Sequence, residues 1–382
     1  MMRHTFKDRL VLTHGRPSGF DYMRILLAVS VVMWHSGLIC GYDTTTTAYK
    51  LVSPFANMIV PMFFTLSGFL VAGSLERSKT LVNFLGLRVL RIMPALSVEV
   101  LLSALILGPL LTTLSLQDYA ASPVFWSYFA NILGEIHYYL PGVFETHPNT
   151  QVNGQLWTVP YELICYILLS GLAVLGLFHK RKWLFYFIVL CYAAQIANTI
   201  YRGHSDLTGP TGSTVVMSFV AGLLIYRYQD RLSHSPILFW AMLIISYMIL
   251  NVPNGSRFVI LPLAYVTCYL GLMNPKRSKV LLSGDYSYGV YLFGFPLQQM
   301  FYAIDPLFRT WIPNTAASLM VAVAMAVISW WLIEKPALSQ RGKLKKLEEW
   351  YLSMSAVQWL RSRILPFQGK ASTKSLLESQ RV

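Results

Sequence analysis

The segment FDYMRILLAVSVVMWHSG, residues 20–37, is apolar enough to cross a membrane, yet it contains an arginine and a histidine. A membrane-spanning helix needs roughly 20 mostly apolar residues. Ionisable side chains are costly in the bilayer interior, so those found there usually have a function. Arg24 and His35 are eleven residues apart. Eleven residues make about three helical turns, so the two share one helix face and lie roughly 16 Å apart. The segment predicts a membrane helix with two functional side chains.

The composition of the whole chain indicates an integral membrane protein. The 382 residues are 55% hydrophobic and only 13% charged, and the mean hydropathy is +0.49. A soluble domain has about 25% charged residues. The net charge of +14 does not indicate nucleic-acid binding, because excess Lys and Arg in a membrane protein gathers in its cytoplasmic loops.

Ten segments are apolar enough to be membrane spans, although the sixth to eighth are short. They are residues 20–41, 53–74, 94–114, 156–178, 183–201, 211–227, 236–251, 257–273, 286–304 and 314–333. Residues 122–140 form a further semi-apolar stretch, which is expected to be interfacial or re-entrant. We therefore expect an all-α integral membrane protein, a bundle of about ten transmembrane helices.

The distribution of basic residues predicts the orientation of these spans. With the N-terminus in the cytoplasm, 26 of the 31 Lys and Arg residues fall in cytoplasmic segments, four fall outside, and Arg24 lies within a span. This alternation follows the positive-inside rule and predicts two cytoplasmic termini. The expected parts are a basic cytoplasmic segment (1–19), a transmembrane domain (20–334) and a basic cytoplasmic tail (335–382).

Two of the few ionisable side chains inside the expected spans are expected at the same depth. Glu162 and His35 each lie about six residues inside the outer end of their span, which is roughly 9 Å. A carboxylate beside an imidazole fixes its tautomer and raises its basicity, as a general base requires. We interpret the pair as catalytic, with a structural pair between two helices as the alternative. Glu99 is expected to be structural and to pair with an arginine.

A second basic element, RVLR at residues 88–91, precedes the third span. Arg88 and Arg91 share one helix face, and two guanidinium groups on one face can clamp a phosphate. Anchoring at the cytoplasmic surface explains them equally well. With Arg24 and His35, they suggest a long phosphorylated ligand that enters from the cytoplasm, with its reactive end at His35. Acyl-CoA has this form.

Motifs along nearly the whole chain resemble those of the acyltransferase family 3 membrane proteins, which O-acylate sugars and other hydroxyl compounds. The first segment is similar to the family's arginine and histidine separated by ten residues. The other matching segments are PMFFTLSGFLVAG (61–73), RVLRIMP (88–94), GQLWTVPYELICYIL (154–168), YSYGVYLFGFPLQ (286–298) and LIEKP (332–336). The resemblance implies about ten helices, an acyl-CoA donor and transfer to a hydroxyl, and it places Glu162 on the family's glutamate.

The chain departs from the family pattern at one position. Many relatives have a histidine in a Tyr-Leu-x-His-x-Pro pattern, where this chain has Gly294. The role of that histidine is absent here or taken over, and Tyr291 is the candidate.

Further residues are candidates for contact with the acceptor or for packing. Ser67 lies toward the inner half of the second span, away from the expected catalytic pair, so we expect a close-packing position rather than a nucleophile. Trp157 and Tyr161 are candidates to flank the acceptor, although aromatic residues at a membrane boundary need no such role. The connection 115–155 has no Lys or Arg. It is interpreted either as a lid over a polar substrate or as a long ordered loop.

These features predict a membrane O-acyltransferase that moves an acyl group, with acetyl favoured, from acyl-CoA to a hydroxyl of a cell-surface saccharide. Arg24, Arg88 and Arg91 would hold the donor, and His35, oriented by Glu162, would take the acceptor's proton. The saccharide is either free or lipid-linked. Acetyl-CoA is the favoured co-substrate, and no bound cofactor, metal or nucleic acid is expected. The expected location is the cell inner (plasma) membrane, as a multi-pass protein in contact with its lipids.

Two other classes remain open. A polytopic glycosyltransferase that uses a lipid carrier needs an acidic residue on the outer side, for which Asp43 is a candidate. A transporter would use Arg24, His35 and Glu162 as an ion path. It would also show a pseudo-repeat between its halves, and none is visible in the sequence.

Overall fold

The computed structural model describes residues 4–78, 80–202 and 209–354, and this part of the chain is built from helices with no β-strand. The longer helices are α2 (Gly19–Ile39), α3 (Thr47–Arg77), α4 (Leu81–Leu102), α8 (Val159–Val174), α9 (Arg181–Arg202), α10 (Gly212–Arg227), α11 (Pro236–Leu250), α13 (Ile260–Gly271), α15 (Ser287–Ile304), α16 (Trp311–Ser329) and α18 (Arg341–Ser353). The short ones are α1 (Phe6–Leu12), α5 (Gly108–Leu111), α6 (Leu116–Ala121), α7 (Pro123–Tyr128), α12 (Gly255–Phe258), α14 (Lys279–Ser283), α17 (Lys335–Ser339), η1 (Ser103–Leu107), η2 (Phe129–Leu133), η3 (Gly154–Thr158), η4 (Pro306–Arg309) and η5 (Trp330–Glu334).

Every segment that the sequence marks as a span contains a helix. Within the described ranges, six helices are long and apolar enough to cross a membrane: Gly19–Ile39, Thr47–Arg77, Leu81–Leu111, Gly154–Val174, Arg181–Tyr201 and Trp311–Trp350. The three short expected spans are the shorter apolar helices α10, α11 and α13, and the ninth is α15. The predicted all-α membrane fold is confirmed at this level.

The third span begins earlier than the sequence suggested. Its helix, α4, starts at Leu81 instead of residue 94, and Pro94 lies inside it. The Thr80 side chain caps the helix by accepting a hydrogen bond from the Asn83 amide at 3.2 Å, which satisfies one of the free amides of its first turn. Arg88 and Arg91 share one helix face, as expected, but they belong to the spanning helix itself and not to a segment before it.

Helices α3 and α10 cross with their backbones in close contact. A Cβ atom on Gly68 would lie 2.0 Å from the carbonyl oxygen of Phe219, and one on Gly222 would lie 2.2 Å from that of Thr65. Only glycine allows this approach at either position. Thr65 also donates to the Ser218 carbonyl at 3.2 Å, so a polar contact fixes the same crossing.

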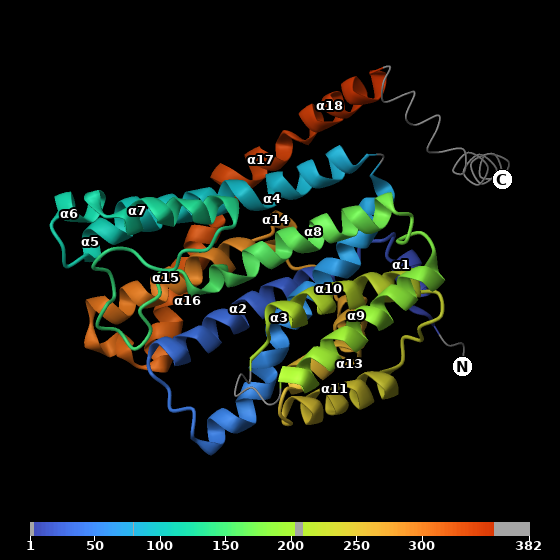
Figure 1. The fold of residues 1–382 in the computed structure, drawn as a ribbon, viewed down its shortest axis with the longest axis horizontal. Coiled ribbons are helices and arrows are strands. Elements are labelled where there is room, and N and C mark those ends of the chain that lie inside the picture. Colours follow the sequence, from blue (N-terminus) through green and yellow to red (C-terminus); the bar gives the residue numbers. More distant parts are fainter. Residues whose placement is uncertain (1–3, 79, 203–208, 355–382) are drawn as a thin grey trace.

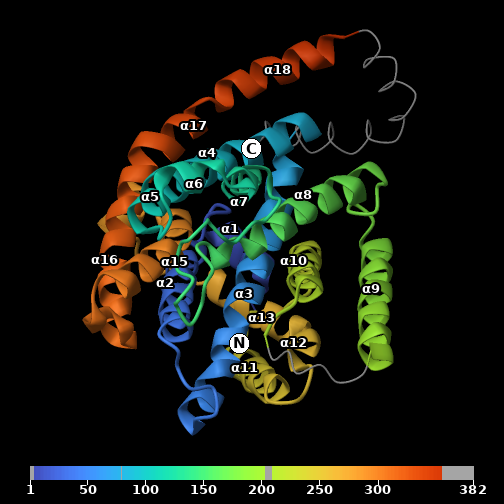
Figure 2. The ribbon, with the colours of Figure 1, turned by 60° about the vertical axis from the view of Figure 1, so that its left-hand side comes forward.

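Helix α15 packs against both α2 and α16 (labelled in Figure 1), and Figure 2 shows it between the two. On one side, a Cβ on Gly289 would lie 2.7 Å from Ala326. On the other side, the Gln298 side chain donates to the Val32 carbonyl at 2.5 Å and to the Ser36 hydroxyl at 2.6 Å. Small residues and one amide thus fix α15 between its neighbours.

The connection between α4 and α8 is ordered and returns into the bundle. Its first part forms α6, α7 and η2, at the left of Figure 1. Further on, the Gln299 side chain donates to the carbonyls of Asn149 and Gln151 at 2.6 and 2.7 Å. Asn153 and Gln155 are fully buried, and Gln155 donates to the Leu292 carbonyl at 2.7 Å. Helix α8 therefore begins inside the protein.

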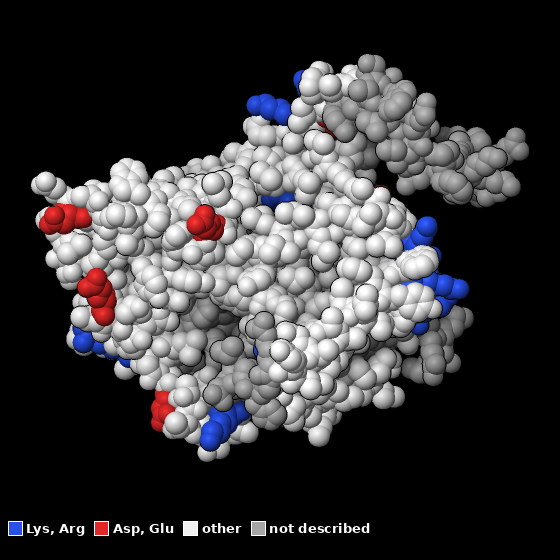
Figure 3. Space-filling view, in the orientation of Figure 1, with Lys and Arg blue, Asp and Glu red and all other residues white. Residues whose placement is uncertain are grey.

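The surface has the charge pattern of a membrane protein. In Figure 3 a broad uncharged area covers most of the visible face, and most of the charged side chains lie around its edge, with Lys and Arg at the right, at the top and at the lower left. The peripheral helices include α9, which stands at the edge opposite α16 in Figure 2. Helix α18 packs on α4, where Thr80 donates to Glu348 at 2.6 Å. Residues 355–382 of the expected basic tail lie outside the described residues.

Candidate active site

A cavity of about 380 Å³ lies at the centre of the bundle, between α2, α3, α4, α8 and α15. Its apolar walls include Val60, Phe63, Phe64 and Ile92. Six of the residues singled out from the sequence line it: Arg24, Ser67, Arg88, Arg91, Glu162 and Tyr291. The structure therefore brings the three arginines and the glutamate to one place, although they come from helices far apart in the chain.

Arg91 is fully engaged with carboxylates. One terminal nitrogen lies 2.6 Å from Asp285 and the other 2.9 Å from Glu334. The rings of Tyr288 and Trp330 flank its guanidinium, with centroids at 5.7 and 6.0 Å. Its charge is compensated inside the protein.

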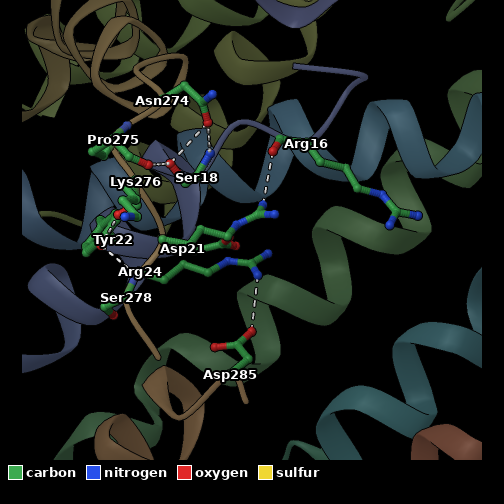
Figure 4. Close-up of polar contacts among 11 residues, drawn as sticks. Arg16, Ser18, Asp21, Tyr22, Arg24, Asn274, Pro275, Lys276, Ser278 and Asp285 are labelled. Atoms are coloured by element: carbon green, nitrogen blue, oxygen red, sulfur yellow. Dashed lines mark hydrogen bonds and ion pairs between the residues drawn. The ribbon is translucent and has the colours of Figure 1, made fainter. Parts of the chain in front are cut away.

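Asp285 links Arg91 to the first helix of the bundle. It precedes α15 and also pairs with Arg24 at 3.2 Å (Figure 4). Burial alone would raise the pKa of Asp285, but the charges of Arg91 and Arg24 outweigh that effect and lower the pKa to about 2. Asp285 is therefore a carboxylate at physiological pH.

Arg88 differs from both other arginines. Its guanidinium donates to the Ser74 hydroxyl at 3.1 Å and lies over the Phe84 ring with 5.9 Å to the centroid. Its Nε is buried without a hydrogen-bond partner. Across residues 4–78, 80–202 and 209–354, no carboxylate forms an ion pair with it.

Glu162 lies in the first turn of α8 and faces this cavity. It accepts a short hydrogen bond from the Tyr166 hydroxyl, and the charges that act on it come from Arg88, Arg91 and Arg24. Tyr166 also interacts with the Ser67 hydroxyl. Glu162, Tyr166 and Ser67 thus form a small polar cluster beside the arginines.

The expected pair of His35 and Glu162 does not form. His35 is absent from the cavity wall, and its ring packs edge-on against Phe295 with centroids 5.1 Å apart. It lies three helical turns from Arg24, roughly 16 Å along α2, whereas Glu162 shares the cavity with Arg24. The expectation assumed that α8 starts at the outer surface. Because residues 149–158 re-enter the bundle, Glu162 lies deeper and meets the arginines.

The imidazole of His35 has no fixed partner. In the described part of the chain, no hydrogen bond to either ring nitrogen is formed, and neither nitrogen is a fully buried unpaired atom. A histidine with a free ring nitrogen can accept a proton from a ligand. The structure therefore leaves His35 available, but without the carboxylate that was expected to orient it.

Ser67 and Glu99 are also placed differently from expectation. Ser67 lines the same cavity as Glu162, although the sequence placed it at another level. Glu99 is fully buried but contacts no arginine; it accepts from the Ser103 hydroxyl at 2.8 Å and interacts with Asn153. The neutral groups of Ser103 and Asn153 take the place of the arginine that was expected to pair with Glu99.

The aromatic candidates separate into two groups. Trp157 and Tyr161 pack edge-on, with centroids 6.0 Å apart, and neither lines the cavity. Tyr291 does line it, and its hydroxyl lies 2.7 Å from the Thr158 hydroxyl and donates to the Gln155 carbonyl at 2.7 Å. At Gly294 a Cβ would lie 2.6 Å from the Val32 side chain, so close packing against α2 replaces a larger side chain there.

Sequence reasoning missed three residues of this site: Asp285, Glu334 and Tyr166. Asp285 directly precedes the YSYG motif and Glu334 lies within LIEKP, so both were within or beside quoted motifs. An acidic residue at the end of an apolar segment, in a chain with several buried arginines, is the signal that could have identified them.

Comparison with known proteins places this chain in a class of enzymes that transfer acyl groups. The acyltransferase domain model, that of acyltransferase family 3, matches residues 18–334, so the chain belongs to this family. An O-acetyl transferase of Shigella phage Sf6 is 24% identical over 349 residues, which cover 86% of this chain and 98% of the relative. Nodulation protein 10 of Rhizobium leguminosarum bv. viciae is 27% identical over 358 residues, with 86% and 95% covered. No solved structure matches the chain.

The protein is therefore an enzyme that acts as an O-acyltransferase, as the motifs predicted. The two alternatives, a glycosyltransferase and a transporter, receive no support from these relatives. Asp43, the residue proposed for the first alternative, accepts from the amide and hydroxyl of Thr45 at 2.8 and 2.7 Å. It is thus engaged in holding its own loop.

Proposed function

We propose that this protein transfers an acetyl group from acetyl-CoA to a hydroxyl group of a cell-surface saccharide. The observation that carries the proposal is the convergence of Arg24, Arg88 and Arg91 on one central cavity. Guanidinium groups bind phosphate oxygens through paired N–H donors. Coenzyme A has phosphates at one end and the thiol at the other, so a cavity with several arginines suits its charged end.

His35 is the proposed general base. The oxygen of the acceptor hydroxyl attacks the thioester carbonyl, the new C–O bond forms, and the C–S bond breaks. His35 takes the hydroxyl proton and returns it to the departing thiolate of coenzyme A. Its free ring nitrogens support this role, and the donor's arm would extend roughly 16 Å along α2 from Arg24 to reach it.

Glu162 is proposed to act on the donor side of the reaction. Its contacts are with Tyr166 and the arginine cavity, so an effect on His35 would have to be indirect. We favour direct transfer in a ternary complex over an acyl-enzyme. Ser67 has Tyr166 and not a histidine as its polar neighbour, and a serine nucleophile needs an adjacent base.

The acceptor is proposed to approach through the connection between α4 and α8. This connection has no Lys or Arg between residues 115 and 155. It lines a second pocket of about 350 Å³, which is open to the surface and whose lining includes the polar groups of Tyr139, Glu145 and Thr150. An aromatic ring, a carboxylate and a hydroxyl are suitable groups for contact with a saccharide. The phage relative is an O-acetyl transferase, which supports acetyl as the transferred group.

The proposed topology is ten spans with both termini in the cytoplasm of a cell with an inner membrane. The alternation of basic residues along the sequence supports it. Helices α1 and α18 lie toward the same end of the molecule in Figure 1, where Figure 3 shows one group of Lys and Arg side chains. The donor would then enter from the cytoplasm and the saccharide from the other side.

The test is transfer by purified protein in lipid nanodiscs. Acetyl-CoA labelled in its acetyl group is supplied with surface glycan from the source cell, and label in the glycan and free thiol are both measured. We expect label in an alkali-labile ester and an equal amount of thiol. If the enzyme used another acyl-CoA but not acetyl-CoA, the proposed identity of the acyl group would be wrong. Release of neither product from any acyl-CoA would overturn the proposed donor.

A further inference from the structure

The three arginines of the central cavity are not equivalent, because two of them are bound to carboxylates of the protein. Arg91 pairs with Asp285 at 2.6 Å and with Glu334 at 2.9 Å, and Arg24 pairs with Asp285 at 3.2 Å. The Glu334 side chain is only 2% exposed. A buried carboxylate of this kind requires a cationic partner. Arg91 is therefore part of the protein's internal ion pairs.

Asp285 is held in place from several directions. Its second oxygen accepts from the Ser287 hydroxyl at 2.6 Å. The segment before it is bound to the start of α2, where Ser18 contacts Asn274 and Tyr22 donates to the Lys276 carbonyl at 2.8 Å (Figure 4). Asp285 thus connects α2 with α4 at the arginine cavity, through contacts with groups of the protein itself.

Arg88 is one turn away from Arg91 and lines the same cavity. Its hydrogen bond goes to the Ser74 hydroxyl, a neutral group, and the salt bridges of the described residues do not include it. Glu162 shares the cavity and its charge interacts with that of Arg88, but no salt bridge joins the two. A cation outside an ion pair gains more from an anionic ligand than a paired cation does, because no existing ion pair has to be broken.

We propose that Asp285 and Glu334 are positioning residues that hold Arg24 and Arg91 as a fixed wall, and that Arg88 is the arginine that binds the phosphate groups of the donor. The two arginines of RVLR then have different tasks: Arg91 shapes the cavity and Arg88 binds the ligand. The identity of the ligand rests on the proposed function, whereas the division between the arginines rests on their ion pairs.

The first experiment compares binding of coenzyme A to Arg88→Gln and Arg91→Gln by calorimetry on purified protein. Loss of a charge-assisted contact costs about 1.5–3 kcal/mol, so we expect Arg88→Gln to weaken binding roughly 10- to 150-fold. Its melting temperature should stay close to that of the wild type. Arg181→Gln is the control, because it breaks a 2.8 Å ion pair with Asp230 outside the cavity and should leave binding unchanged.

The second experiment measures the ion pairs without any ligand, through a double-mutant cycle of Arg91→Gln and Glu334→Gln. Each single change leaves a partner without its counter-charge, so each should lower the melting temperature. The melting temperature of the double variant should fall by clearly less than the sum of the two single decreases, because neither charge is then left unpaired. Additive losses would overturn the assigned role of Glu334. This result does not depend on which donor the enzyme uses.

Asp285 is tested by kinetics with acetyl-CoA. We expect Asp285→Asn to raise the donor KM at least tenfold, with a small change in kcat and in the acceptor KM, and Asp285→Glu to recover part of the loss. If Arg91→Gln weakened coenzyme A binding as much as Arg88→Gln at unchanged melting temperature, the division would be wrong. If the wild type bound no coenzyme A, the proposed donor would fail, and the cycle alone would decide the positioning role.

Discussion

His35 has a ring nitrogen free to take a proton, so its removal should act mainly on turnover. We expect His35→Ala to lower turnover by about 100- to 10,000-fold, the usual contribution of a positioned general base. Coenzyme A binding and the melting temperature should change little, because the ring packs against Phe295 but bonds to no described group. A variant that keeps more than about a tenth of wild-type turnover would exclude the role.

Glu162 lies among the arginines, so its neutralisation should act on the donor. We expect Glu162→Gln to leave the KM for acetyl-CoA unchanged or to lower it several-fold, because the cavity becomes more positive. The loss in kcat should be much smaller than that of His35→Ala. Asp43→Asn removes an acid from a distant loop and serves as the control in the same assay. A loss in kcat as large as that of His35→Ala would make Glu162 the better candidate for the base.

The ion pairs of Asp285 should contribute to stability over a defined pH range. Its pKa falls from 3.8 to about 2 in the folded protein. A lowered pKa gives stability that is complete above the unfolded value and is lost as the pH falls through the folded value. The difference in melting temperature between wild type and Asp285→Asn should be constant from about pH 5 to 8 and shrink below pH 3.8 toward about 2. A difference that grows on acidification would contradict the ion pairs.

At the scale of helices, the crossing of α3 and α10 depends on two glycines. We expect Gly68→Ala to destabilise the protein by about 1–3 kcal/mol or more, because its Cβ would lie 2.0 Å from a backbone carbonyl oxygen that cannot move freely. Gly171→Ala in α8 is the matched control, since no atom lies within 4 Å of its added Cβ. It should be neutral or stabilising by roughly 0.5–1 kcal/mol. Thermal unfolding in one detergent compares them, and equal effects would argue against the close crossing.

The two sides of the membrane should differ in access to the donor site. Inside-out vesicles should use externally added acetyl-CoA without permeabilisation, and right-side-out vesicles should not. Arg88→Glu should raise the KM for acetyl-CoA far more than that for the acceptor, because phosphate meets like charge. Equal use of the donor from both faces of sealed vesicles would contradict the proposed topology.

The order of the helices and the family were accessible from the sequence. A sufficiently long apolar segment predicts a helix wherever it occurs. Backbone N–H and C=O groups in a membrane must be hydrogen-bonded, and a helix satisfies them within the segment itself. The motif around Arg24 and His35 and the RVLR element pointed to the acyltransferase family. These signals lie within short stretches of chain, so no long-range contact was needed to read them.

The composition of the site was decided by the tertiary structure. The depth of Glu162 in the bundle depends on residues 149–158, which lead into α8. Their position is fixed by Gln299 and by the Leu292 carbonyl, both more than 130 residues away. The return of this segment into the bundle brings Glu162 to the arginines and leaves His35 without a carboxylate partner. The pairing of Arg91 with Asp285 and Glu334 likewise joins distant helices. The sequence determined which segments form helices and marked Arg24, Arg88, Arg91 and Glu162 as candidates for the site. Only packing decided which charges neutralise each other, because a charge pairs with its nearest partner in space.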